Sequence, residues 1–389
     1  MKKVVLAYSG GLDTSCAIKW LKDKGFSVVA FIADVGQGED FNLIKKRALK
    51  TGASKVYVKD LKNEFIKDFI WPSLKANAVY EDKYLLATAL SRPLIAKYLV
   101  SIAKQEKTQC IAHGCTGKGN DQVRFEVSAS ILSPNIKIIA PVRIWEFKSR
   151  DQEIDYAKAK KIPINVTKKK PYSIDMNLWG VSIECGVLED PWKEPPKDVY
   201  QWTVDPANAP NKPTYCTVEF NKGIPIKLNG KNYAAKELIN KICEMASDNG
   251  IGRSDMIENR LVGIKSREIY EATAATVLHL AHKELEALVL DRETLHFKAS
   301  VSQKYAELIY YGLWYSQLKN ALDKFIDYTQ QNVSGIVKIK LHKGKAICVG
   351  RKSKYSLYKE ELATYSEKDK FNQSLAEGFV KLWGLPHIR

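Results

Sequence analysis

A strand that leads directly into a glycine-rich turn and then into a helix is the feature that most restricts how this chain folds. Apolar residues predict a strand from Val4 to Tyr8, a helical pattern follows from Cys16 to Lys24, and the turn between them is Ser9-Gly10-Gly11-Leu12-Asp13-Thr14-Ser15. The glycines let the backbone approach a ligand, and the free amide groups at a helix start attract anions. Because three hydroxyl side chains add further donors, the sequence predicts an anion-binding loop.

Strand and helix patterns alternate through the first part of the chain, to about residue 165. Short buried strands are predicted at Lys3–Tyr8, Ser27–Asp34, Lys55–Val58, Gln109–Ala112 and Ile136–Ala140. Amphipathic segments between them, Thr14–Lys24 and Phe41–Lys50, are each followed by a glycine suited to a left-handed helix end. This alternation predicts a doubly wound α/β domain, in which a parallel sheet binds its ligand at the carboxyl ends of the strands.

The rest of the chain predicts a second domain and an arm. The pattern breaks near Ile162–Pro171, and Asp190–Pro213 contains six prolines and is expected to be an ordered loop. A hairpin pattern at Thr217–Leu228 with a turn signal at Asn229-Gly230, then a helix from Ala235 to Ser247, indicate an α+β domain. From about Lys359, apolar residues in helical spacing predict either an arm that packs on another subunit or a helix folded back on its own chain. We therefore divide the chain into residues 1–166, 167–358 and 359–389.

Composition argues against several other classes of protein. The net charge is +17, but 50 of the 61 basic residues are lysines spread along the chain, whereas recognition of phosphates and bases favours arginine. The seven cysteines are scattered and form no Cys-x-x-Cys pair, so neither a disulfide framework nor a zinc site is predicted. No apolar run approaches the about 20 residues that span a bilayer. We therefore expect a cytoplasmic enzyme that binds neither nucleic acid nor a membrane.

A second glycine-rich segment follows the strand at Gln109–Ala112, where a doubly wound sheet has its ligand crevice. Three glycines, 114, 117 and 119, lie among Thr116, Lys118, Asn120, Asp121 and Arg124. This mixture of cationic donors, amide groups and one carboxylate suits a zwitterion. His113 beside it is interpreted as a packed histidine.

The first loop is neither a Walker loop nor a dinucleotide-binding fingerprint, and it resembles the loop of ATP pyrophosphatases. Four segments in order, the loop, Glu81–Leu86, Gly114–Glu126 and Glu258–Glu271, resemble the argininosuccinate synthase family. The resemblance implies an ATP-dependent ligase that joins citrulline and aspartate through a citrullyl-adenylate and releases AMP and pyrophosphate. It further implies ATP with Mg²⁺ as substrate, no tightly bound cofactor, and a homotetramer.

The resemblance also assigns residues, because positions of the family's motifs fall on matching side chains here. The ATP positions are Ala7, Tyr8, Ser9, Gly10, Gly11, Leu12, Asp13, Thr14, Ser15, Ala33 and Gly114. The aspartate positions are Thr116, Asn120 and Asp121, and the citrulline positions are Tyr84, Asn120, Arg124, Ser173, Ser182, Glu258 and Tyr270. Catalytic roles fall on Asp13, Asp121 and Arg124, and no position is assigned to a protein-bound metal. Asp13 acts either as a helix cap or through the metal of the nucleotide.

Two departures and two rival functions accompany this assignment. A family serine is replaced by Ala89, with Thr88 beside it, and Glu271 is followed by Ala272 to Ala275 without the usual proline. The main rival is a tRNA-modifying adenylating enzyme with the same loop, which requires reactive thiols such as those of Cys110 or Cys115. The other is a regulatory nucleotide-binding module without turnover.

Overall fold

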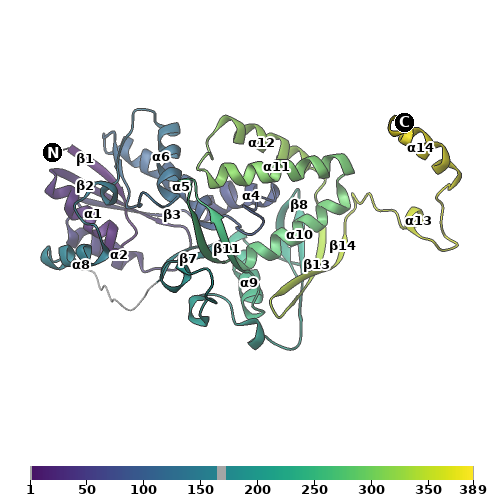
Figure 1. Cartoon of the computed structure of the whole chain (residues 1–389), viewed down its shortest axis with the longest axis horizontal. Coiled ribbons are helices and arrows are strands. Elements are labelled where there is room, and N and C mark those ends of the chain that lie inside the picture. Colours follow the sequence, from purple (N-terminus) through teal and green to yellow (C-terminus); the bar gives the residue numbers. More distant parts are fainter. Residues whose placement is uncertain (1, 164–171, 389) are drawn as a thin grey trace.

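The first half of the chain folds around a parallel sheet, as the alternating pattern predicts. The computed structural model describes residues 2–163 and 172–388. Five strands, arranged in the order β3-β2-β1-β4-β5, run parallel, with β1 at the centre (Figure 1). Their bounds are Lys2–Ala7 (β1), Phe26–Asp34 (β2), Lys55–Asp60 (β3), Cys110–Ala112 (β4) and Lys137–Ile139 (β5). Each predicted strand of this half is confirmed within a few residues.

Helices cover both faces of this sheet, which confirms the doubly wound class. Alternate residues of β1 point to opposite faces, so Val4 enters one hydrophobic core and Val5 the other. The first core includes residues of α1 (Leu12–Asp23), α2 (Phe41–Thr51) and α8 (Arg150–Ala159). The second includes residues of α5 (Ala87–Gln105) and α6 (Asp121–Leu132) and continues into the rest of the molecule.

The glycine-rich turn is shorter than its sequence suggests. Helix α1 begins at Leu12, with Gly11 as its N-cap and no side chain capping it, so half of the predicted turn is already helical. The second helix ends as expected at Gly52, which is left-handed with φ of 116°.

Two antiparallel sheets form the second half, which confirms the α+β prediction. Strands β6 (Ser173–Asn177), β7 (Gly180–Glu184), β11 (Arg253–Asn259) and β12 (Lys265–Glu271) pair in the order β11-β12-β7-β6. Strands β8 (Thr214–Asn221), β9 (Ile224–Leu228), β10 (Lys231–Asn232), β13 (Gly335–His342) and β14 (Lys345–Lys352) pair in the order β10-β9-β8-β13-β14. The predicted hairpin is β8–β9, and Asn229-Gly230 makes the next turn, between β9 and β10.

Helices pack around these sheets and join them to the first half. The long ones are α9 (Ala235–Asp248), α10 (Thr273–Val289), α11 (Arg292–Tyr310) and α12 (Gln317–Thr329). Short ones are α3 (Lys62–Phe65), the π-helix η1 (Ile66–Ile70), α4 (Trp71–Lys75), α7 (Pro141–Ile144) and three 3₁₀ turns at Gly186–Glu189, Lys197–Val199 and Pro206–Asn208. Within the described ranges, no helix is long and apolar enough to cross a membrane.

One buried carboxylate anchors the middle of the proline-rich segment. Glu271 is fully buried and accepts hydrogen bonds from the backbone amides of Gln201, Trp202 and Thr203, at 2.6 to 3.2 Å, and from the Thr203 hydroxyl at 2.6 Å. The glutamate that precedes the Ala272–Ala275 departure therefore holds the loop, and α10 begins two residues later at Thr273.

The C-terminal arm extends away from the body of the molecule (Figure 1). It contains α13 (Glu360–Ala363), α14 (Ser374–Gly384) and a 3₁₀ turn at Leu385–His387. The apolar side of α14 is uncovered, with Phe379 61%, Leu382 74% and Trp383 65% exposed. A helix folded back on its own chain is thus not what the structure contains. The proposed boundary between residues 166 and 167, like the lysines at 168–170, lies outside the described residues.

Candidate active site

A cavity of about 910 Å³ opens at the carboxyl ends of the central strands, between the two halves of the chain. The residues assigned to ATP, aspartate and citrulline line this cavity, with the exception of Gly10 and Ser15. The structure therefore brings together side chains that lie up to about 260 residues apart in the sequence, Ala7 and Tyr270 among them. The same wall includes residues that sequence reasoning missed: Thr88, Arg92, Arg150, Asp175, Glu184, Arg260 and Glu268.

The two exceptions support the loop from behind. Gly10 has φ of +83°, its carbonyl accepts a hydrogen bond from Arg47 Nη1 at 2.6 Å, and a Cβ there would lie 3.0 Å from Ile44. Ser15 is fully buried, and its hydroxyl pairs with that of Tyr8 at 3.0 Å. Both residues therefore help to fix the shape of the loop, and their assignment to ATP remains a prediction.

The remaining loop groups face the cavity and suit an anion. The Ser9 and Thr14 hydroxyls lie 3.1 Å apart at the start of α1, next to amide groups that the helix leaves free. A Cβ on Gly114 would lie only 2.8 Å from the Thr14 methyl group, so glycine is what allows the second loop to approach the first. Ala33 completes this side of the cavity at the end of β2.

Asp13 does not cap its helix. It lies in the first turn of α1, lines the cavity, and neighbours Glu153 of α8. Burial, followed by the adjacent Asp13 carboxylate, raises the pKa of Glu153 to about 8, so the Glu153 carboxyl holds a proton at neutral pH. In residues 2–163 and 172–388, no group of three or more His, Cys, Asp or Glu side chains is arranged to hold a metal ion.

His113 is a packed residue, as interpreted from the sequence. It is 1% exposed, its Nε2 lies 3.0 Å from Glu126, and its Nδ1 accepts a hydrogen bond from the Cys115 amide. Since both ring nitrogens are engaged, the imidazole orients the second loop.

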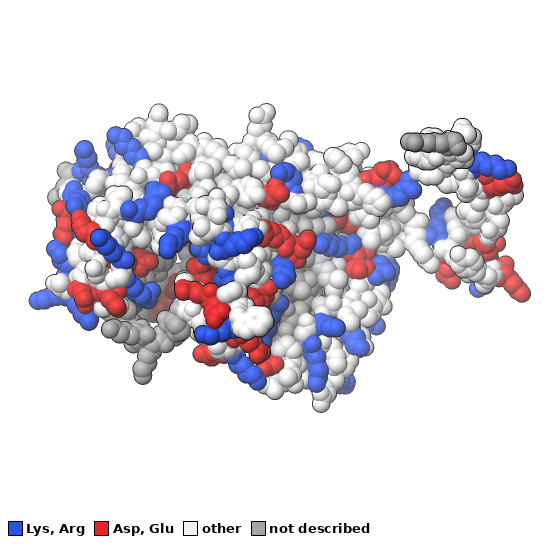
Figure 2. Space-filling view, in the orientation of Figure 1, with Lys and Arg blue, Asp and Glu red and all other residues white. Residues whose placement is uncertain are grey.

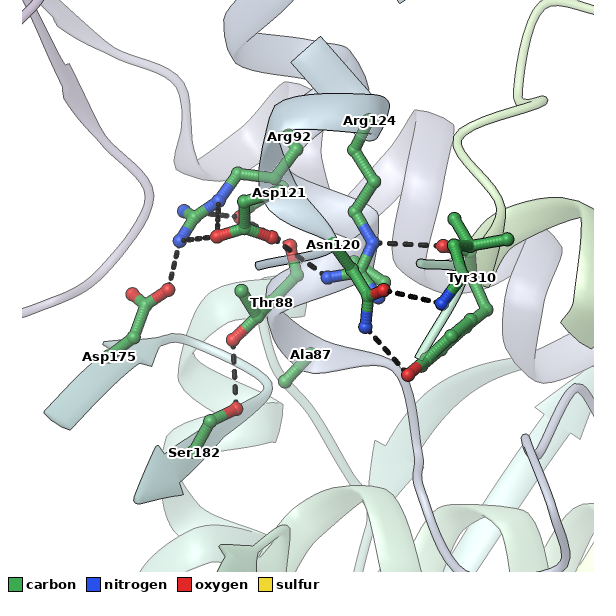
Figure 3. A network of polar contacts seen from close by, with 12 residues as sticks. Ala87, Thr88, Arg92, Asn120, Asp121, Arg124, Asp175, Ser182 and Tyr310 are labelled. Atoms are coloured by element: carbon green, nitrogen blue, oxygen red, sulfur yellow. Dashed lines mark hydrogen bonds and ion pairs between the residues drawn. The ribbon is translucent and has the colours of Figure 1, made fainter. Parts of the chain in front are cut away.

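Asp121 is held between two arginines, which Figure 3 shows. Its Oδ2 accepts a hydrogen bond from Arg92 Nε at 2.8 Å, and its Oδ1 accepts one from Arg124 Nη1 at 2.8 Å. Although burial by itself raises the pKa of this carboxyl, the two guanidinium charges hold the pKa below its ordinary value. Asp121 is therefore an anion throughout the physiological range. Arg92 also pairs with Asp175 of β6.

A second cluster joins α6 to the second half of the chain through Tyr310. The Tyr310 hydroxyl accepts a hydrogen bond from Asn120 Nδ2 at 2.7 Å and donates to Glu258 at 2.6 Å, while its carbonyl accepts from Arg124 Nε at 3.0 Å. The other oxygen of Glu258 accepts from the Tyr270 hydroxyl at 2.6 Å. No sequence motif surrounds Tyr310. Its contacts with the site residues are therefore seen only in the structure, where α11 packs beside the cavity.

Tyr84 supports the start of α5. Its hydroxyl oxygen accepts hydrogen bonds from the amides of Thr88 and Ala89 at 3.1 and 3.2 Å, and its ring stacks on Tyr270. Ala89 is fully buried, whereas the Thr88 hydroxyl lines the cavity and lies 2.9 Å from that of Ser182. A hydroxyl group is thus present at this wall although the family serine is replaced by alanine.

Comparison with known proteins identifies the family. The model for the arginosuccinate synthase N-terminal HUP domain matches residues 3–163, and the model for its C-terminal domain matches residues 172–388. The argininosuccinate synthase of Caldanaerobacter subterraneus subsp. tengcongensis is 59% identical over 99% of this chain and 94% of its own length. Those of Halalkalibacterium halodurans and Chlorobium luteolum are 57% and 54% identical over 99% of this chain and 94% and 96% of their own lengths. The chain belongs to the argininosuccinate synthase family.

Membership of the argininosuccinate synthase family confirms the resemblance seen in four segments of the sequence. Among solved structures, a predicted subunit of a tRNA methyltransferase from Methanocaldococcus jannaschii aligns at 16% identity over 41% of this chain and 76% of that one, with a TM-score of 0.30, a value too low to support any inference.

The raised pKa of Glu153 predicts a stability that falls as the pH rises. Between the ordinary pKa of a glutamate, about 4.3, and the folded-state value, the folded protein binds a proton that the unfolded chain has lost, so raising the pH destabilises the fold. Glu153→Gln removes this dependence. Because Glu153 is only partly buried, we expect the Tm advantage of the variant to grow by about 2 °C between pH 5 and pH 8.5.

Differential scanning fluorimetry at the two pH values measures this advantage. Asp155→Asn, an exposed carboxylate of the same helix, serves as the control. A Tm advantage for Glu153→Gln that stays constant with pH would contradict the raised pKa of Glu153.

Proposed function

We propose that the cavity joins citrulline to aspartate at the expense of ATP, with the residue roles that follow. The observation that carries the proposal is that one cavity contains both an anion loop at a helix start and, across from it, a set of charged and amide groups suited to two amino acids. The first set suits phosphates and the second suits zwitterions, and a ligase that forms AMP needs both within reach of one another.

ATP binds along the first loop with its phosphates at the start of α1. The Ser9 and Thr14 hydroxyls and the free amides hold the pyrophosphate that leaves, which is fixed electrostatic stabilisation of a leaving group. Mg²⁺ arrives with the nucleotide and neutralises part of the phosphate charge. Asp13 is the loop carboxylate that faces this space, and we assign it a role through the metal of the nucleotide. No tightly bound cofactor is proposed.

Citrulline binds between α6 and the sheet of β6, β7, β11 and β12. Arg124 pairs with its α-carboxylate, because Nη2 of Arg124 makes no hydrogen bond to another described residue while its other nitrogens are anchored. Glu258, oriented by two tyrosines, accepts the α-ammonium. The hydroxyls of Tyr84, Ser173 and Ser182 orient the ureido end.

Aspartate binds at the start of α6, beside citrulline. Thr116 and Asn120 supply donors to its carboxylates, and the anion of Asp121 attracts its ammonium. The ureido oxygen of citrulline attacks the α-phosphorus of ATP, and the aspartate amine then displaces AMP, a far better leaving group than an oxide of a urea. Holding both partners in one cavity makes the second step effectively unimolecular.

The tRNA-modifying alternative is not favoured by the thiols or by the surface. Burial, followed by the neighbouring Asp121 carboxylate, raises the pKa of Cys115, and burial raises that of Cys110, so neither thiol is a reactive thiolate. Figure 2 shows Lys and Arg interspersed with Asp and Glu on the face in view, without a continuous basic stripe. A regulatory module without turnover would give no role to the side chains that are assigned to the two amino-acid substrates.

Purified protein with ATP, Mg²⁺, citrulline and aspartate is expected to release AMP and pyrophosphate in equal amounts. Replacing the two amino acids by tRNA should give no pyrophosphate above the background with ATP alone. The measurement is a coupled pyrophosphate assay with nucleotide chromatography. Release of ADP, or release of pyrophosphate that depends on tRNA, would rule the proposal out.

Asp121→Asn should impair the second step, attack by aspartate, and leave the first step, adenylation of citrulline, in place. Because the aspartate ammonium loses its anionic partner, we expect the KM for aspartate to rise and kcat/KM to fall by about 100-fold or more, which corresponds to loss of a hydrogen bond between charged groups. Citrulline-dependent exchange of labelled pyrophosphate into ATP should continue. Loss of the exchange in a variant whose Tm is unchanged would count against the assignment.

The arm is proposed to hold a homotetramer together by covering its apolar side on another subunit. Leu382→Asp combined with Trp383→Asp places two charges on that side and should shift the mass measured by light scattering from tetramer to a smaller species. Glu377→Gln, on an exposed ion pair of the same helix, is the control and should leave the mass unchanged. A tetramer that survives the double change would mean that other surfaces hold it.

A further inference from the structure

Asp175 is a carboxylate of the cavity that no motif indicated. It lies on β6 opposite Ser182 of β7, lines the cavity, and its side chain is 38% exposed. Figure 3 shows it on the far side of Arg92 from Asp121. It is thus close to the aspartate site of the proposed function without belonging to any assigned binding position.

The two carboxylates on Arg92 differ in how fully they are engaged. Both oxygens of Asp121 accept hydrogen bonds from arginine, one from Arg92 and one from Arg124. Only Oδ2 of Asp175 is paired, with Arg92 Nη2, and its Oδ1 makes no hydrogen bond within the part of the chain that the structure describes. Each oxygen of Asp121 therefore already has an arginine partner, whereas Asp175 retains an oxygen that can take a proton.

The two carboxylates are also close together. One nitrogen, Arg92 Nη2, contacts Oδ2 of Asp121 at 2.8 Å and Oδ2 of Asp175 as well, so the two oxygens share a single guanidinium nitrogen. An ammonium group attracted by Asp121 consequently lies beside Asp175.

The second step of the proposed reaction needs a base. Aspartate arrives with its amine protonated, and an ammonium has no lone pair with which to attack carbon. We propose that Asp175 is the general base that removes a proton from the α-ammonium of bound aspartate, and that Arg92 is the positioning residue that holds Asp175 next to it. This inference rests on the proposed function and completes its second step.

The step balances as follows. One N–H bond of the ammonium breaks, and its proton forms an O–H bond on Asp175. The lone pair left on nitrogen forms the C–N bond to the carbon of the protonated, adenylated ureido group, and the C–O bond to AMP then breaks with its electron pair going to the phosphate oxygen. A second proton of the attached nitrogen passes to the departing phosphate, which leaves a guanidinium product. Asp175 returns its proton to water.

The surroundings of Asp175 suit a base of this kind. The charged groups that face it are Arg92 on α5, Asp121 and Arg124 on α6, and Glu39, which precedes α2. Burial raises its pKa, the Arg92 charge lowers it and the Asp121 charge raises it, and the net direction is upward. A base with a raised pKa loses its active, ionised form as pH falls, at a higher pH than an ordinary aspartate. The acid limb of kcat/KM for aspartate is therefore expected to report Asp175.

The test compares Asp175→Asn with Asp255→Asn in the full-length enzyme. Asp255 is a matched control because it also lies on a strand, pairs with an arginine and has a 39% exposed side chain, but it does not line the cavity. Three rates are measured for each variant: citrulline-dependent exchange of pyrophosphate into ATP, formation of argininosuccinate from aspartate as a function of pH, and AMP release when hydroxylamine replaces aspartate. Hydroxylamine is largely unprotonated at neutral pH and needs no base.

We expect Asp175→Asn to reduce kcat with aspartate by about 10²- to 10⁴-fold and to abolish the acid limb, while exchange and hydroxylamine capture stay within about 3-fold of wild type. Asp255→Asn should match wild type in all three. A loss below about 10-fold with aspartate, or an equal loss with both nucleophiles, would overturn the role of Asp175 as base.

Two further outcomes separate this inference from the proposed function. Absence of citrulline-dependent exchange in the wild type would reject the proposed function itself. If Asp175→Asn loses exchange because the site is disturbed, Asp175→Glu is the deciding variant. Restored exchange, together with an acid limb in the reaction with aspartate, would support the proposal. Restored exchange without argininosuccinate at any pH would overturn it.

Discussion

The buried pairing of Asp121 with Arg92 and Arg124 is the interaction on which the cavity depends. Removing an unpaired charge from water costs several kcal/mol, and here each charge is compensated only if α5, α6 and β6 hold their relative positions. Arg124 adds a bond to the carbonyl of Tyr310 at the end of α11, so the same network reaches the second half of the chain. The wall of the cavity is therefore fixed before any substrate arrives, which is the condition for electrostatic catalysis without reorganisation.

Polar side chains of the cavity that already have hydrogen-bond partners also affect how substrates bind. Glu258 accepts a hydrogen bond on each oxygen from a tyrosine, and the Asn120 amide is engaged at both ends, with Tyr310 and with the Leu261 amide. Since a buried unpaired carboxylate is costly, these partners stabilise the carboxylate and the amide and hold them in place at the cavity. A zwitterionic substrate then binds favourably, because the charged groups that it contacts are already oriented.

The features of this structure that depend on local residue patterns could be predicted from the sequence. The five parallel strands, the anion loop and the second glycine-rich segment follow from periodicity and from glycine placement, and the family motifs gave the residues that line the cavity. Arg92, Asp175 and Tyr310 escaped prediction because their roles come from contacts across 83 to 190 residues, which no local pattern encodes. Gly10 and Ser15 illustrate the opposite limit: they stand within the motif, yet neither is among the residues that line the cavity.

Carboxyl groups near the two ends of the cavity meet opposite electrostatic demands. At the phosphate end, Glu153 is neighboured by a carboxylate, and its raised pKa leaves a proton in place, which lessens the repulsion that a polyanionic nucleotide meets. At the amino-acid end, two arginines keep Asp121 ionised, which an incoming ammonium requires. The difference between Glu153 and Asp121 does not come from the residue type, since both side chains end in a simple carboxyl group. It comes from whether a guanidinium or another carboxyl lies next to the buried oxygen, and the fold decides this by placing α8 at one end of the cavity and α5 and α6 at the other.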